Sequence, residues 1–392
     1  MDEVYQVVLK VLAAFFVTGI LSFLLTPPVK RLAHRIGAID VPKDARRMHK
    51  KPIPRLGGLA IYISFVIVSL VLGQWNMQNF TILIGSAIIV VLGIFDDRNA
   101  LSAKFKFGIQ LIAAAIPVVF GNLRIELITN PNLFSGELYV KFGALAIPIT
   151  IIWIVAITNA VNLIDGLDGL AVGVSAIACM TMLAVSLLIG EVPIAILLAV
   201  LAGACVGFMP FNLNPASIFM GDTGSTFLGF MLATLSIQGM FKVYAIISFA
   251  VPFLILGLPI FDTAFAFTRR ILSGRSPFSP DRGHVHHRLI DMGFNQKQTV
   301  AILYIISTVL GLLAVVLTTS GEYRAIVMVL VVLITCVVCG FIYLSAERRK
   351  MKLHEQKLHE LNQQENEQQK IAEQTQDADD TSDRGGFDNE DN

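Results

Sequence analysis

The chain has 392 residues, of which 55% are hydrophobic and 15% are charged, and its formal net charge at pH 7 is +1. So few charges could not cover the surface of a water-soluble protein of this composition, which excludes that class and indicates a membrane-embedded chain. The near-zero net charge carries little information by itself, and we expect no nucleic-acid partner.

Apolar runs long enough to cross a bilayer recur along the chain. A transmembrane helix needs about 17 to 25 predominantly apolar residues. Eleven such runs are present, at residues 5–26, 56–74, 79–96, 106–121, 144–161, 169–190, 193–211, 223–240, 243–268, 299–318 and 323–345. The sequence therefore predicts an all-α polytopic membrane protein with about 11 transmembrane helices.

Basic residues in the loops predict the orientation of these spans. The loop at 26–55 contains nine Lys or Arg residues and two Asp residues, and such loops stay in the cytoplasm. The N-terminus is then outside and the C-terminus is cytoplasmic. Alternation places further loops in the cytoplasm, at 97–105, 162–168, 212–222 and 269–298.

Two irregularities are expected within this pattern. The outside loop at 122–143 alternates apolar and polar residues, which predicts a small extracellular β-hairpin. Pro252 and Pro259 predict a kink in the ninth span. Asp262 lies in the same span, and we expect it to face protein or the cytoplasmic mouth rather than lipid.

The composition changes after residue 345, which we take as the end of the transmembrane catalytic domain, residues 1–345. Residues 346–376 are rich in Lys, Glu, Gln and Leu and predict a polar cytoplasmic helix or coil. Residues 377–392 are rich in Asp, Gly, Ser and Asn and predict a disordered acidic tail. We assign this tail no catalytic role, and a regulatory or partner-binding role is left open.

Three polar clusters lie at the predicted cytoplasmic ends of spans. Their carboxylates and carboxamides are Asp96 and Asp97; Asn159, Asn162, Asp165 and Asp168; and Asn212 and Asp222. Near the bilayer centre a polar group of this kind costs about 2.5 to 3.5 kcal/mol, and less at the end of a span. Ordinary interfacial charge is the alternative for Asp96 and Asp97. We predict instead that the three clusters meet in one site.

The loop at 281–288 contains His284, His286 and His287 beside Arg288. Three histidines in four residues also permit zinc, which usually needs a distant partner ligand. Imidazoles beside arginines fit phosphate oxygens and sugar hydroxyls better.

The carboxylates of the three clusters, together with these basic residues, suit Mg²⁺ held by carboxylates and substrate phosphates. Such a set of residues is sufficient for phosphoryl transfer. The chain contains no Walker loop and no dinucleotide fingerprint.

The sequence resembles the polyprenyl-phosphate N-acetylhexosamine-1-phosphate transferases. The resemblance covers about residues 1–345 and is carried by motifs in the family's order, at 54–58, 96–98, 159–170, 212–225 and 284–289. Members transfer a sugar 1-phosphate from a UDP-sugar to a lipid phosphate at the cytoplasmic face, release UMP and require Mg²⁺. The resemblance therefore implies a multi-pass enzyme of the bacterial plasma membrane.

The resemblance also implies roles for individual residues. Asp96, Asp97 and Asp222 would be catalytic, with Asp97 as the base that activates the lipid phosphate. Asp222 and Asp97 would bind Mg²⁺, or Mn²⁺ in its place. The implied substrate-binding residues are Lys51, Lys104, Asn159, Asn162, Asp165, Asp168, Asn212, His284, His286, His287 and Arg288.

Two loops resemble the branch of the family that uses UDP-N-acetylglucosamine, at 52–58 and 282–288. The expected reaction transfers N-acetylglucosamine 1-phosphate to undecaprenyl phosphate by direct displacement and begins a cell-wall polymer of the teichoic acid type. A phospho-N-acetylmuramoyl-pentapeptide transferase and a two-step covalent route remain alternatives. A secondary transporter is the rival class, although transport sites lie near the bilayer midplane. The oligomeric state is left open, a homodimer included.

Overall fold

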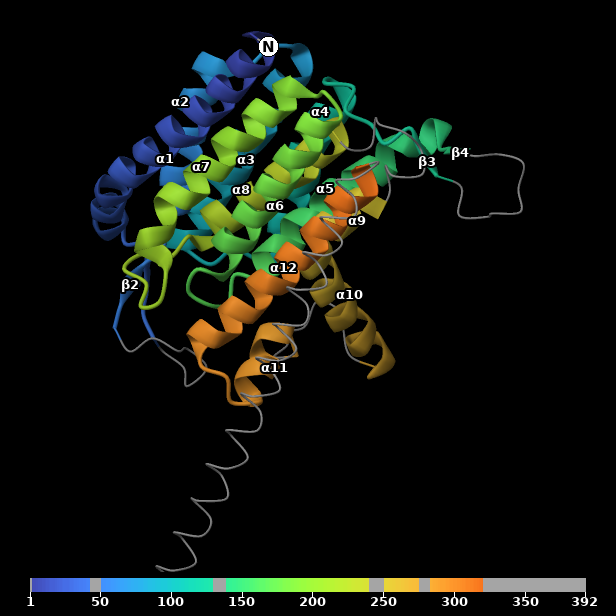
Figure 1. The fold of residues 1–392 in the computed structure, drawn as a ribbon. Helices are drawn as coiled ribbons and strands as arrows, with labels where there is room; N and C mark the ends of the chain where they lie inside the picture. The colour runs from blue at the N-terminus through green and yellow to red at the C-terminus, as the bar shows by residue number, and fades with distance from the viewer. Residues whose placement is uncertain (1, 43–50, 130–138, 240–249, 275–282, 320–392) are drawn as a thin grey trace, which may run out of the picture. The chain divides into compact units, whose positions relative to one another are not determined.

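The structure is a computed structural model that describes residues 2–42, 51–129, 139–239, 250–274 and 283–319. The chain divides into two units, Met1–Ile334 and Thr335–Asn392, and all described residues belong to the first. The described part is mostly helical (Figure 1). Its helices are α1 (Asp2–Ile36), α2 (Gly58–Leu72), α3 (Met77–Arg98), α4 (Ala103–Val119), α5 (Ala146–Leu163), α6 (Leu170–Leu188), α7 (Val192–Asn212), α8 (Gly221–Gly239), α9 (Ala250–Ile255), α10 (Gly257–Leu272), α11 (Val285–Asp291) and α12 (Gln296–Thr318).

Helices lie over ten of the eleven predicted apolar runs. Six of the described helices are long and apolar enough to cross a membrane: α1, α3, α5 with the short 3₁₀ turn before it, α6, α7 and α12. The eleventh run, at 323–345, lies outside the described residues, as do the predicted cytoplasmic segment and the acidic tail. The eleven-span topology and its orientation therefore stay predictions.

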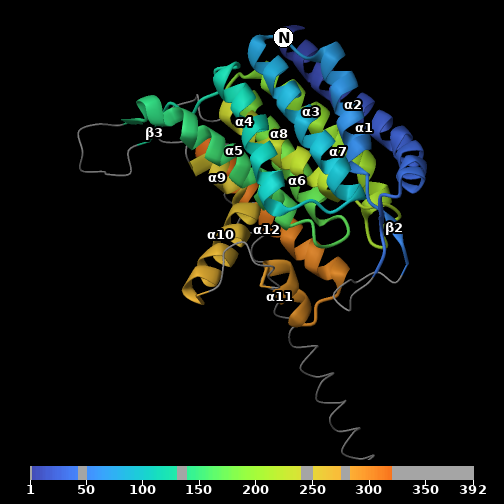
Figure 2. The same cartoon turned by 180° about the vertical axis from the view of Figure 1, so that it is seen from behind.

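Helix α8 is the centre of the bundle. Every one of its residues except Asp222 is buried. It packs against α3 and α5, and also against α2, α6 and α7, and it lies among these helices in both views of the ribbon (Figures 1 and 2). By contrast, α1 exposes Phe16, Ile20 and Leu24, as expected of a helix that faces lipid. Asp222, the one residue of α8 that is not fully buried, thus belongs to a helix that is surrounded by other helices.

Glycines let the backbones of α2 and α3 approach the first turn of α8. A Cβ atom on Gly58 of α2 would overlap the backbone of Gly224, and one on Gly93 of α3 would overlap the backbone of Thr223. Small residues at helix interfaces permit such close packing in membrane proteins. The start of α8 is consequently held by two neighbouring helices at backbone distance.

Four short strands form two antiparallel pairs. Strand β1 (Ile39–Asp40) pairs with β2 (Ile53–Pro54), and β3 (Leu127–Thr129) pairs with β4 (Tyr139–Lys141). The second pair lies where the sequence predicted a β-hairpin, but the connecting residues, 130–138, are outside the described residues. The hairpin and its extracellular position therefore stay predictions.

The predicted kink near Pro252 and Pro259 is a break between two helices. Helix α9 ends at Ile255 and α10 begins at Gly257, with Leu256 in a non-helical conformation between them. Residues 243–249 of this predicted span are outside the described residues. After the break, α10 extends toward the end of the bundle at which α11 lies (Figure 1), and its residue Asp262 is buried.

Candidate active site

A cavity of about 930 Å³ lies where α5 ends and α8 begins. It is lined by the residues before α2, the turn between α5 and α6, the loop between α7 and α8, and the start of α12. Residues from all three predicted polar clusters approach this region. The predicted site residues that line the cavity are Lys51, Asn162, Asp165, Asp168, Asn212, Asp222 and His287.

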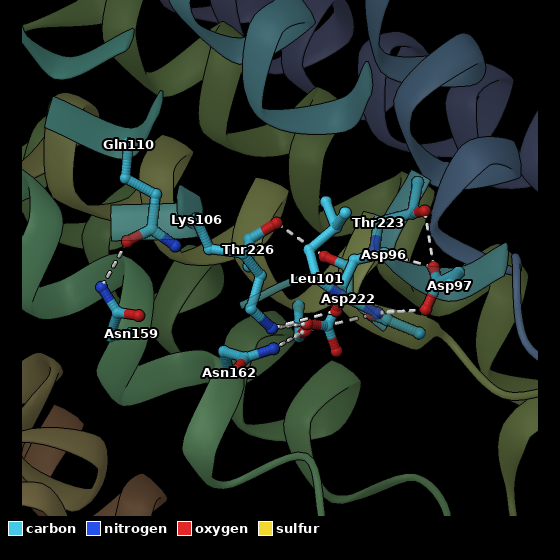
Figure 3. A network of polar contacts seen from close by, with 12 residues as sticks. Asp96, Asp97, Leu101, Lys106, Gln110, Asn159, Asn162, Asp222, Thr223 and Thr226 are labelled. Carbon is cyan, nitrogen blue, oxygen red and sulfur yellow. Dashed lines mark hydrogen bonds and ion pairs between the residues drawn. The ribbon is translucent and has the colours of Figure 1, made fainter. Parts of the chain in front are cut away.

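Asp222 lies between two basic side chains at this cavity. Its Oδ2 atom is 2.8 Å from Lys106 Nζ, and its Oδ1 atom is 3.6 Å from Arg55 Nη2. The Asp222 side chain is 19% exposed, and the two basic side chains are 27% exposed. Lys106 also lies 2.9 Å from Asp96 Oδ2, so that it joins two carboxylates (Figure 3). Asp222 is therefore a solvent-accessible carboxylate held in a fixed, cationic surrounding.

Asp97 has a different environment, because its side chain is completely buried. Its Oδ1 atom accepts hydrogen bonds from Arg55 Nε at 3.1 Å and from the Asp222 backbone N–H at 2.9 Å. Its Oδ2 atom accepts from the Thr223 backbone N–H at 3.0 Å and from the Thr223 hydroxyl at 2.6 Å (Figure 3). The first N–H groups of a helix have no partner within that helix, and a carboxylate stabilises them. Asp97 thus caps α8 from α3.

The loop before α2 joins the same corner through its backbone. The Phe219 N–H donates to the Pro54 carbonyl at 2.8 Å, and the Gly57 N–H donates to the Phe219 carbonyl at 2.9 Å. The Gly58 N–H continues the pattern with the Met220 carbonyl at 2.8 Å. This pairing places Arg55 beside Asp97 and Asp222, which explains how the motif at 54–58 contributes to the site.

Asp168 and Asn212 tie the two polar turns to each other. Asp168 Oδ2 accepts hydrogen bonds from Asn214 Nδ2 at 2.9 Å and from the Ala216 N–H at 3.0 Å. Asn212 Oδ1 accepts from the Gly169 N–H at 3.2 Å. The resemblance implied substrate binding for both residues. In the structure their side chains line the cavity and also hold its wall together.

Asp165 is another half-buried carboxylate of the same wall. Burial raises its pKa to about 7, and the negative charges of Asp222 and Asp97 act in the same direction. The carboxylates of all three clusters therefore interact electrostatically, and nearby positive charge would favour the ionised form of Asp165.

The histidine loop, which we define as residues 283–288 and which includes the first turn of α11, brings one of its three histidines to the cavity. His287 lines the cavity, whereas the ring of His286 lies against Gly166 and the ring of His284 faces Asp262. The guanidinium of Arg288 lies over the ring of a phenylalanine of α10. Burial lowers the pKa of His286 to about 4, so this imidazole is neutral at pH 7.

Two other predicted residues lie away from the cavity lining. Asn159 donates from Nδ2 to Gln110 Oε1 of α4 at 2.7 Å. Lys104 is exposed on the first turn of α4, and Lys106 is the lysine that reaches the carboxylates. Lys106 and Gln110 are four residues apart and so share one face of α4. That spacing was the signal in the sequence that could have identified Lys106.

Helix α12 adds two residues that sequence reasoning missed. Gln296 lines the cavity, and its Oε1 atom accepts a hydrogen bond from Asn214 Nδ2 at 2.7 Å. The Tyr304 hydroxyl donates to the Gly169 carbonyl at 2.5 Å. Both residues hold the turns that carry the polar clusters, and no spacing pattern linked them to those turns.

Comparison with known proteins gives the family. Residues 79–240 match the model of glycosyl transferase family 4. The chain is 42% identical to a probable undecaprenyl-phosphate N-acetylglucosaminyl 1-phosphate transferase of Bacillus subtilis, over 83% of this chain and 90% of that protein. It is 36% identical to a decaprenyl-phosphate N-acetylglucosaminephosphotransferase of Mycobacterium tuberculosis, over 73% and 77%.

A third relative is the undecaprenyl-phosphate alpha-N-acetylglucosaminyl 1-phosphate transferase of Escherichia coli, which is 27% identical over 83% of this chain and 87% of its own length. The family model covers most of α3 and all of α4 to α8, and six of the described helices are apolar enough to cross a membrane. The protein is thus a multi-pass bacterial membrane enzyme that belongs to glycosyl transferase family 4.

Proposed function

We propose that the enzyme transfers N-acetylglucosamine 1-phosphate from UDP-N-acetylglucosamine to undecaprenyl phosphate at the cytoplasmic membrane face and releases UMP. The observation that carries this proposal is the position of Asp222, which lies at a large polar cavity between Lys106 and Arg55. Cavities of roughly 300 to 1,000 Å³ accommodate ligands of this size class. The names of the relatives in B. subtilis and E. coli support the same donor sugar and lipid.

Charge balance supports a divalent cation at Asp222. Asp96, Asp97 and Asp222 are paired with two basic side chains, and Asp165 senses Asp97 and Asp222 electrostatically. With these carboxylates ionised, the cluster has two more negative than positive charges, which Mg²⁺ would neutralise. The described residues contain no group of three or more His, Cys, Asp or Glu side chains that could hold a metal. Mg²⁺ commonly uses one or two carboxylates and completes its coordination with substrate phosphates and water.

We therefore assign Asp222 as the protein ligand of Mg²⁺ and propose a holding role for Asp97. The four hydrogen bonds that Asp97 accepts occupy both of its oxygens, which leaves it poorly placed to bind a metal or accept a proton. When bound, Mg²⁺ would neutralise the diphosphate and polarise the β-phosphoryl group.

The chemistry then needs positioning more than proton transfer. An oxygen of the lipid phosphate forms a bond to the β-phosphorus, and the bond from that phosphorus to the bridging oxygen breaks, so that UMP leaves. The second pKa of a phosphate monoester is about 6, and the attacking oxygen is largely ionised at neutral pH. Lys106 and Arg55 would stabilise the negative charge that shifts onto the leaving UMP. Direct displacement needs no covalent aspartyl intermediate.

An apolar cavity of about 480 Å³ between α5 and α10 offers a place for the polyprenyl chain. Its wall includes Ile152 and Trp153 of α5 and Ile260 and Phe267 of α10. These side chains match the apolar character of an isoprenoid, and α5 ends at the turn that lines the polar cavity. We further propose, from the branch-specific loops, that the product begins a cell-wall polymer of the teichoic acid type.

The test is UMP release by the purified protein in detergent with Mg²⁺ and undecaprenyl phosphate. UDP-N-acetylglucosamine and UDP-N-acetylmuramoyl-pentapeptide are offered separately, and Asp222→Ala is compared with Asp291→Ala, which changes an exposed carboxylate of α11. The proposal expects release with the first donor, loss of release in Asp222→Ala and retention in Asp291→Ala. Release with the second donor alone would change the branch, and release with neither donor would restore the transporter as the leading alternative.

A further inference from the structure

One side of helix α10 holds the histidine loop. Asp262, Phe265 and Arg269 are spaced by three and four residues, which places them on one side of the helix. Each of the three contacts the loop. The loop is therefore attached to α10 along two turns of helix.

The contacts of Arg269 and Phe265 hold the two ends of the loop. Arg269 Nη1 donates a hydrogen bond to the Gly283 carbonyl at 3.0 Å. The guanidinium carbon of Arg288 lies 4.6 Å from the centre of the Phe265 ring, within the range of a cation–π interaction. Both contacts involve partly or fully exposed side chains, so they guide the loop more than they fix it.

The third contact, which Asp262 makes with His284 and Val285, is buried. Asp262 Oδ2 lies 2.9 Å from His284 Nδ1, and Asp262 Oδ1 accepts a hydrogen bond from the Val285 N–H at 2.8 Å. The side chains of Asp262 and His284 are only 2% and 6% exposed. A buried carboxylate that loses its partners strongly destabilises the folded state. The loop cannot move away from α10 without leaving Asp262 unpaired, which makes this contact the fixed point of the loop.

Packing transmits this fixed point to the cavity. The ring of His286 stacks on that of His284, with centres 5.7 Å apart and planes 8° from parallel. His286 in turn lies against Gly166 and within 4.3 Å of the His287 ring, measured between ring centres. His287 lines the cavity. The orientation of His284 therefore constrains where His287 can lie.

We propose that Asp262 is a positioning residue that holds the histidine loop so that His287 contacts the UDP-sugar. The role of His287 in this inference rests on the proposed function. Asp262 itself is not among the described residues that line the polar cavity, so its effect on the donor must pass through the loop. The competing role is a buried ion pair that supports only the fold.

The kinetic test compares Asp262→Ala and Asp262→Asn with the wild-type enzyme. The asparagine variant keeps an acceptor for the Val285 N–H and a side chain of similar size, which protects against simple failure to fold. We expect the KM for UDP-N-acetylglucosamine to rise by about tenfold or more in Asp262→Ala, with the KM for undecaprenyl phosphate changed less than about twofold. A lower kcat with both KM values unchanged would indicate a smaller folded fraction and overturn the positioning role.

A double-mutant cycle shows whether Asp262 acts through His287. If it does, Asp262→Ala adds little to the KM effect of His287→Ala. If the KM of the double variant rose by the product of the two single-variant factors, the inference would be overturned. Asp291→Ala is the matched control, since it removes a carboxylate from the exposed end of α11, and it should leave both KM values unchanged.

A third measurement requires no substrate and so separates this inference from the proposed function. Hydrogen exchange of the α11 amides should become faster in Asp262→Ala than in the wild type, while α12 keeps its protection. Unchanged exchange in α11 would overturn the positioning role even in an active enzyme. If the wild type released UMP with neither donor, the proposed function would fail, and faster exchange would still establish that Asp262 holds the loop.

Discussion

The carboxylate of Asp97 accepts hydrogen bonds from both the backbone N–H and the hydroxyl of Thr223, a residue 126 positions later in the chain. The backbone N–H of Asp222 donates to the same carboxylate. A helix is usually capped by a residue directly before it. Here the cap of α8 comes from α3, and it fixes the residue that we assign to Mg²⁺.

The role of Asp97 can be tested with Asp97→Asn. The amide keeps one acceptor oxygen and loses the other, so we expect kcat/KM to fall by about 10-fold to 100-fold. Because we assign Asp97 to hold Asp222 and not to accept a proton, the loss should be similar at every pH from about 6 to 9, the range over which the lipid phosphate completes its ionisation. A loss that grows only toward low pH would support Asp97 as a base.

Two lysines of α4 provide a matched pair. Lys106 bridges Asp96 and Asp222, whereas Lys104 is exposed two residues earlier. We expect Lys106→Ala to lower kcat/KM by about 100-fold or more, because it removes a positive charge beside Asp222, where we place the reacting diphosphate. Lys104→Ala should stay within about twofold of the wild type. Equal losses in both variants, measured by UMP release, would contradict the assignment.

His286 should make the protein less stable in acid. Burial lowers its pKa from 6.5 to about 4 in the folded protein, so the unfolded chain binds more protons between these values. The corresponding stability is present above pH 6.5 and is lost as the pH falls toward 4. We expect the Tm of His286→Asn to fall less than that of the wild type between these two pH values, with EDTA present throughout. Parallel Tm curves for the two proteins would refute this explanation.

Two glycines on neighbouring helices should respond oppositely to alanine. A Cβ at position 93 would overlap the backbone of Thr223, and a Cβ at position 108 would meet no atom within 4 Å. We expect Gly93→Ala to destabilise the protein by about 1 to 3 kcal/mol and to displace Asp222. Gly108→Ala should be neutral or stabilise α4 by up to about 1 kcal/mol, since alanine favours a helix. Thermal unfolding in detergent measures the change in stability, and UMP release by the folded protein reports the displacement of Asp222. A stable, fully active Gly93→Ala would contradict both effects.

Hydropathy predicted the positions of most of the helices, because a segment that crosses a bilayer is recognised from its own local composition. It also located the three polar clusters, since a carboxylate within an apolar run is conspicuous. The break between α9 and α10 lies between Pro252 and Pro259, and it fits Pro259, which has no N–H for the carbonyl one turn earlier. These features each depend on a short stretch of chain.

The partners within the site could not be predicted in the same way. Hydropathy shows that Asp97 is unusual but does not identify Thr223 as its donor, because the contact depends on how α3 packs against α8. Helix phase decides that Lys106, and not Lys104 two residues earlier, reaches Asp96 and Asp222. Gln296 contacts Asn214 across 82 residues, and no pattern in the sequence connects the two. Tertiary packing decides each of these pairs.

The interhelical cap also has a consequence for biogenesis. A hairpin of α7 and α8 inserted into the membrane without α3 would leave the first amides of α8 without the Asp97 carboxylate, and Asp222 would have no defined orientation. The position that we propose for Mg²⁺ therefore forms only when helices made at different times during translation have come together. A chain in which α3 and α8 have not yet packed together would lack this fixed position for Asp222, even with both helices already in the bilayer.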